Sequence, residues 1–163
     1  MKKPSEIKSI DIKYGIIPPK GFLAITWFGK MYINKKNKEE WEGYSDTYKR
    51  RVIRHEMIHV RQAEKEHNSW FCFYIKYLWY WLKAMFLCGF KNSIAYYCVP
   101  YEVEAYIHEK QPLYKLSRFE FYQKVPIKVY VELKKASNNT IEFATKIAEM
   151  IEEQYKRYKE ENS

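Results

Sequence analysis

Several features common in secreted or modular proteins are scarce in this chain of 163 residues. Its three cysteines, Cys72, Cys88 and Cys98, form no Cys-x-x-Cys pair, which argues against a disulfide framework and is typical of a reduced, intracellular protein. No apolar stretch follows the polar segment 1–6, so no secretory signal is expected. Internal repeats and a break between domains are also absent. The sequence therefore predicts one cytoplasmic domain, 1–163, in which 113–163 is a helical C-terminal extension.

The charge of the chain is strongly positive, and its aromatic content is high. Lys and Arg number 29 against 20 Asp and Glu, which gives a net charge of +9, and aromatic residues make up 18% of the chain. Such a balance favours acidic partners, either nucleic acid or an anionic lipid surface. Two basic clusters could serve this purpose, Lys35-Lys36-Lys38 and Lys49-Arg50-Arg51-Arg54. Charge alone does not choose between these partners.

The first third of the chain predicts a β-hairpin followed by a helix. A turn signal at 18–21 precedes a β-prone run at 22–28 and a second short strand at 31–33. Residues 35–42 are expected to form a polar loop. Ser45 and Asp46 are good N-caps for a helix that runs to about residue 67, with apolar residues at helical spacing.

Residues 70–90 are almost entirely apolar or aromatic. Lys76 and Lys83 interrupt this run and, being seven apart, lie on one face of a helix. Two lysines argue against a simple membrane-spanning helix. A helix packed into a large core and a helix lying on a membrane surface both remain open interpretations.

The remaining segments predict further helices and one strand. Pro100 is expected to open a helix that runs to about residue 110. The segment 125–133 alternates loosely like a strand. Asn139 and Glu142 have the form of a capping box at the start of a terminal helix. The predicted fold class is α+β and mainly helical.

The motif His55-Glu56-Met57-Ile58-His59 lies on the helix expected from residue 45. Two histidines four apart project from one helical face and can bind one zinc ion. Glu56 would be the general base that accepts a proton from a zinc-bound water, as in the His-Glu-x-x-His metallopeptidases. The alternative is a charged helix face on which both histidines are merely solvated.

A catalytic zinc usually has a third protein ligand. Glu102 and Glu104 lie on the predicted helix 101–110 and point about 200° apart, so one of them at most is expected to face the metal. His108 is four residues after Glu104, and these two form a second possible ligand pair on the opposite face.

Residues 51–62, together with Glu102-Val103-Glu104-Ala105-Tyr106, resemble the zincin metallopeptidases of gluzincin type. The spacing from Glu102 to Ala105 is similar to that of the membrane-associated zinc peptidases of the CAAX-processing type. Small Bacteroidetes-type metallopeptidase-like proteins are also similar over roughly residues 20–110. The resemblance implies a minimal zincin-like fold, with zinc held by His55, His59 and Glu102, and Glu104 as the alternative third ligand.

One departure from that family concerns the groups that surround the ligands. The larger peptidases usually carry an Asp directly after the Ala, and this Asp often orients a histidine ligand; here the residue is Tyr106. Gln62, one turn after His59, could orient a histidine or contact the substrate. Tyr106 and Gln62 are therefore candidates for the second shell or for substrate contact.

The function that these residues predict is zinc-dependent hydrolysis, with a peptide or protein as the substrate. One alternative is a basic module that binds either nucleic acid or an anionic membrane surface. Of these two partners, nucleic acid is not favoured. Another is a zincin-like scaffold without catalysis. A cytoplasmic location is expected, with peripheral membrane contact through residues 70–90 as a further hypothesis.

Overall fold

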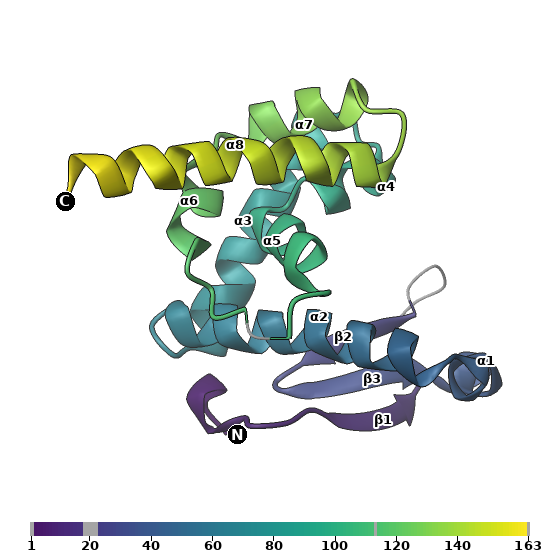
Figure 1. The fold of residues 1–163 in the computed structure, drawn as a ribbon. Helices are drawn as coiled ribbons and strands as arrows, with labels where there is room; N and C mark the ends of the chain where they lie inside the picture. Colours follow the sequence, from purple (N-terminus) through teal and green to yellow (C-terminus); the bar gives the residue numbers. More distant parts are fainter. Residues whose placement is uncertain (1, 18–22, 113, 163) are drawn as a thin grey trace. The chain divides into compact units, whose positions relative to one another are not determined.

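The computed structural model describes residues 2–17, 23–112 and 114–162 (Figure 1). Eight α-helices and three strands are assigned among these residues, so the mainly helical α+β fold class is confirmed. The likeness to a minimal zincin stays a prediction. Residues 1–73 with 109–113 form one compact unit, and residues 74–108 with 114–163 form another. We call them the sheet unit and the helical unit.

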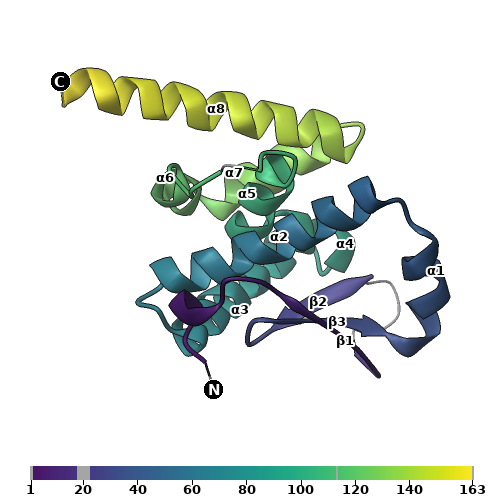
Figure 2. The ribbon, with the colours of Figure 1, turned by 60° about the horizontal axis from the view of Figure 1, so that its bottom comes forward.

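A three-stranded sheet forms the base of the sheet unit, with the strand order β1-β3-β2 (Figure 2). β2 (Ala24–Trp27) and β3 (Lys30–Asn34) are antiparallel, so the predicted hairpin is confirmed. Phe28 and Gly29 connect them at φ angles of 49° and 76°, which suits a two-residue hairpin turn. β1 (Asp11–Gly15) adds a parallel partner to β3. The turn predicted at 18–21 lies outside the described residues.

The polar loop predicted at 35–42 is wrong, because this segment is helical. A short 3-10 helix, η2 (Lys35–Asn37), leads into α1 (Lys38–Gly43). Trp41 is its one buried residue and packs with Met31 and Ile33 of β3. A single apolar anchor is enough to fold a polar run against a sheet, and it leaves no periodic pattern in the sequence.

The helix that carries the motif, α2 (Asp46–Lys65), begins as predicted. The Ser45 hydroxyl accepts a hydrogen bond from the Tyr48 amide at 3.3 Å, which caps the helix. Val52 and Ile53 pack on the cluster formed by Met31, Ile33 and Trp41. A second 3-10 helix, η1 (Pro4–Glu6), also packs on α2.

The helical unit contains most of α3 (Trp70–Leu87), followed by α4 (Asn92–Tyr97), α5 (Pro100–His108), α6 (Phe119–Lys124), α7 (Ile127–Lys135) and α8 (Thr140–Glu161). α6 and α8 both pack on α5, and α8 also runs along α7 (Figures 1 and 2). The segment 114–162 therefore shares its core with residues 74–108. None of the helices in the described residues is both long enough and apolar enough to cross a membrane.

The strand expected at 125–133 is wrong, and the terminal helix is confirmed. α7 buries Ile127, Tyr130 and Val131, whose spacing of three and four residues is helical and decides against a strand. At α8 the Asn139 side chain accepts from the Glu142 amide at 2.9 Å. The Glu142 carboxylate bonds to the amide of Asn138, one residue earlier than in a standard capping box.

Candidate metal centre

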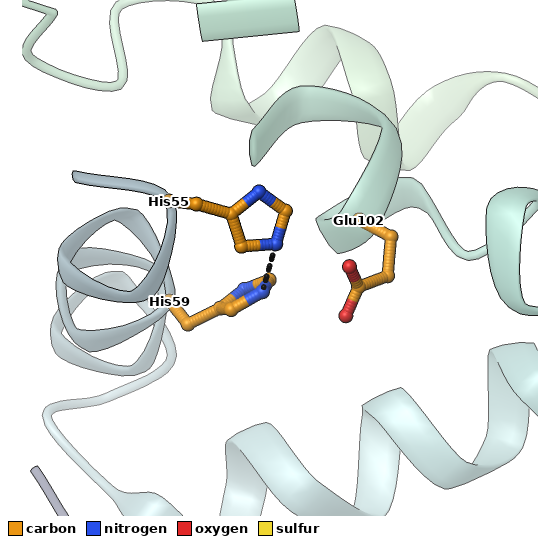
Figure 3. Close-up of side chains that lie close together, drawn as sticks. All are labelled: His55, His59 and Glu102. Carbon is orange, nitrogen blue, oxygen red and sulfur yellow. Dashed lines mark hydrogen bonds between the residues drawn. The ribbon is translucent and has the colours of Figure 1, made fainter. Parts of the chain in front are cut away.

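Two imidazole rings on α2 face each other. His55 and His59 are both buried, at 6% and 7% exposure, and their ring centroids are 4.9 Å apart. Their Nε2 atoms approach to 3.2 Å (Figure 3). This is the geometry expected of two side chains that are separated by about one helical turn and directed to the same side.

Each of these rings has an oxygen at its other nitrogen. The His55 Nδ1 lies 3.0 Å from a carboxylate oxygen of Glu109. The His59 Nδ1 lies 2.7 Å from the side-chain oxygen of Gln62, which is fully buried. Because both partners are acceptors, we assign the proton of each neutral ring to Nδ1. The Nε2 atoms then carry the lone pairs.

Two lone pairs that face each other repel unless a proton or a cation lies between them. Tetrahedral zinc with Zn–N bonds of about 2.05 Å separates two ligand nitrogens by about 3.3 Å, close to the distance here. Hydrogen bonds at Nδ1 are also what metal-binding histidines usually make. The donor set on α2 therefore fits zinc.

Glu109 is the residue that sequence reasoning missed. Arg51 Nε lies 3.2 Å from its second carboxylate oxygen, and Arg54 Nε donates to its backbone carbonyl at 2.7 Å. The available signal was its spacing, because Glu109 follows Glu102 by seven residues and immediately follows His108. The larger zinc peptidases usually carry an Asp at the position of Tyr106. In this chain Glu109 places a carboxylate beside His55 instead.

The basic cluster on α2 makes its bonds within the sheet unit. Besides Arg51 and Arg54, Lys49 donates to the Glu42 carbonyl at 2.7 Å, and Arg50 lies 3.5 Å from the Thr47 hydroxyl. Two of the four cations therefore hold the segment that supplies Glu109.

Glu56, the predicted general base, is buried on α2 at 7% exposure. It follows His55 directly, so its side chain leaves the helix about 100° from that of His55. Burying a charged carboxylate is costly unless the group is paired or hydrogen-bonded.

Glu102 is a buried carboxylate of α5 in the helical unit. The Tyr77 hydroxyl donates to it at 2.8 Å. Tyr106 has its pKa raised well above the usual range, first by burial and then by the negative charge of Glu102. The ring of Tyr106 lies against those of Tyr96 and Tyr97.

The alternative pair, Glu104 and His108, belongs to a separate network of tyrosines. Glu104 is fully buried and accepts a hydrogen bond from Tyr114 at 2.6 Å. His108 Nε2 lies 3.0 Å from the Tyr122 hydroxyl, and its ring stacks on that of Tyr114 with centroids 3.6 Å apart. Both groups therefore have structural partners in the helical unit.

Figure 3 draws His55 and His59 of the sheet unit and Glu102 of the helical unit, and each of the three side chains is buried. These are the three residues of the predicted ligand set.

No protein-family model, curated protein or solved structure matches this chain. The resemblance to gluzincins therefore rests on the motif residues and their spacing.

Proposed function

We propose that the chain is a zinc-dependent hydrolase that cleaves peptide bonds. His55, His59 and Glu102 would hold the metal, a water molecule would take the fourth position, and Glu56 would be the general base. The peptide substrate is inferred from the resemblance to zinc peptidases. The metal is inferred from the geometry of the donor atoms on α2. We place this activity in the cytoplasm, as the cysteine usage predicts.

The observation that carries this proposal is the pair of Nε2 atoms 3.2 Å apart, with an acceptor oxygen at each Nδ1. In a solvated pair of histidines, neither the close approach nor the two buried acceptors would be needed. Glu109 and Gln62 would fix the tautomer and the ring orientation of both ligands before the metal arrives.

Glu102 is favoured over Glu104 as the third ligand. Glu102 is the ligand that the resemblance to the zinc peptidases selects, whereas the carboxylate of Glu104 belongs to the tyrosine network that also holds His108. The histidines belong to the sheet unit and Glu102 to the helical unit, so a shared ion is a prediction that needs its own test.

Bound zinc would supply Lewis acidity and would lower the pKa of its water towards about 7. Glu56 would take the proton of that water as a peptide carbonyl is attacked, and would then pass it to the leaving amine. Its position beside His55 leaves it close to the ligands without making it one of them. Burial would keep bulk water from competing for this proton.

The test is the metal content of the purified protein and of the double variant His55→Ala/His59→Ala. We expect about one zinc per wild-type chain and none in the double variant. The matched control is His67→Asn, because His67 is exposed and its φ of 56° is one that asparagine tolerates. Equal metal in all three proteins, or none in any of them after incubation with zinc, would overturn the proposal.

The third ligand and the base are tested separately. Glu102→Gln should weaken zinc binding, whereas Glu104→Gln should leave it unchanged; the opposite order would make Glu104 the ligand. Glu56→Gln should retain zinc and lose peptide hydrolysis. Hydrolysis that survives Glu56→Gln would remove this residue from the mechanism.

A further inference from the structure

The outer face of α3 is apolar and exposed over its whole length within the helical unit. The large side chains on it are at least 39% exposed: Ile75, Leu78, Trp79, Leu82, Phe86, Leu87 and, just beyond the helix, Phe90. We call this set the α3 stripe. Ile75, Leu78, Leu82 and Phe86 follow one another at intervals of three or four residues and so form one continuous face.

The opposite face of α3 is already used by the core of the helical unit. Ala84 is buried there, as is Cys88 just beyond the helix, and Tyr80, Trp81 and Met85 pack against the same core. The helix is thus held on one side, with its most apolar side facing outward. Contiguous exposed apolar surface of this kind marks an interaction site.

The charged residues near the α3 stripe indicate which kind of partner it binds. Lys76 and Lys83 are exposed on α3, and Lys83 lies over the ring of Trp79 at 4.7 Å from its centroid. No Asp or Glu occurs from residue 67 to residue 101, whereas Lys76, Lys83 and Lys91 do. Apolar and aromatic side chains in a segment that has lysines and no acidic residue match the boundary between the acyl chains and the anionic headgroups of a membrane.

A second copy of the chain is a poorer occupant of this surface. A symmetric dimer through the stripe would bring the lysines of both copies to one interface. The segment offers no carboxylate to pair with them, so like charges would face each other.

We propose that the α3 stripe binds the surface of an anionic lipid bilayer, with α3 lying in the plane of the headgroups. Trp79 and Phe86 enter the acyl boundary, and the ammonium groups of Lys83 and Lys91 reach the lipid phosphates. This inference does not depend on the metal centre, and binding is expected in the presence of a chelator as well.

The experiment is co-sedimentation of the full chain with two kinds of vesicles. One kind is phosphatidylcholine with about a third phosphatidylglycerol, and the other is phosphatidylcholine alone. We expect binding to the anionic vesicles, weaker binding to the neutral ones, and a decrease with salt. Trp79→Ser/Phe86→Ser should weaken binding at least about tenfold, because two exposed aromatic groups no longer enter the membrane.

Matched variants separate the stripe from general hydrophobicity and charge. Ile16→Ser/Ile141→Ser removes two apolar side chains that are at least 79% exposed elsewhere, and should leave binding unchanged. Lys83→Glu/Lys91→Glu should weaken anionic-vesicle binding more than Lys128→Glu/Lys156→Glu, which changes the net charge equally. Circular dichroism checks that every variant is folded.

Three results would overturn the inference. They are the absence of vesicle binding, equal effects of the stripe variants and their controls, and a dimer of the wild type that Trp79→Ser/Phe86→Ser dissociates in the absence of lipid. The last result would assign the stripe to a second copy of the chain.

Discussion

Replacing Glu109 with glutamine removes the negative charge beside His55 and keeps a hydrogen-bond acceptor of nearly the same shape. In the wild type the carboxylate lies 3.0 Å from the His55 Nδ1, so that ring donates to a charged group. A hydrogen bond to a charged group contributes about 1.5–3 kcal/mol, against about 1 kcal/mol for a neutral one. The variant should therefore bind zinc about 1–2 kcal/mol more weakly, or about five- to thirtyfold.

Competition with a chromophoric zinc chelator at neutral pH measures this difference. Glu64→Gln is the matched control, because Glu64 is also a carboxylate paired with an arginine, Arg61, at 2.9 Å, and it has the same change in charge. We expect wild-type affinity from this control. A zinc affinity of the folded Glu109→Gln protein within twofold of the wild type would refute the assignment of His55 Nδ1 as a donor that supports metal binding.

Two further substitutions and one unaltered thiol test the packing and the protonation of the fold. Trp41→Ala should lower the free energy of unfolding by about 3–5 kcal/mol in urea titrations, because the indole is the buried anchor of α1; a loss below about 1 kcal/mol would contradict this packing. Gly29→Ala should cost more than about 1 kcal/mol by the same assay, since φ is 76° there and the new Cβ would lie 2.8 Å from Ile7; an unchanged unfolding midpoint would contradict this close approach. Burial raises the pKa of Cys98 from 9.0 to about 12, so its thiol should resist iodoacetamide in the native protein at pH 9 and react after unfolding. Because the unfolded thiol loses its proton first, the stability that this burial provides should fall as the pH rises from about 9 towards 12.

Elements with strong local signals could be predicted from the sequence. The serine cap of α2, the asparagine cap of α8 and the hairpin formed by β2 and β3 each depend on residues that are close together in the sequence. The segment 125–133 predicts a strand because Val, Ile or Leu occupies every second position there. In the fold, the buried residues are Ile127, Tyr130 and Val131, a helical subset that becomes visible only once α7 packs on α8. β1 pairs with a strand that begins 19 residues later, which local patterns do not predict either.

The same distinction between local and distant residues applies to the candidate site. Spacing on one helix was enough to predict that His55 and His59 share a face, and the hydrogen bond to Gln62 needs only the next turn of α2. The acceptor for His55 is 54 residues away, and no local pattern connects the two.

Glu109 also explains why the charge of α2 was open to two interpretations. As a sequence, Lys49-Arg50-Arg51-Arg54 resembles a surface for nucleic acid or lipid. In the fold, Arg51 and Arg54 lie on the side of α2 that holds Glu109, one on its carboxylate and one on its carbonyl. Reversing these two charges should therefore displace the acceptor of His55 and weaken zinc binding, whereas the nucleic-acid hypothesis expects a loss of nucleic-acid binding alone. Two of the basic residues that favoured a competing function thus hold the group that accepts from His55 in the candidate metal centre.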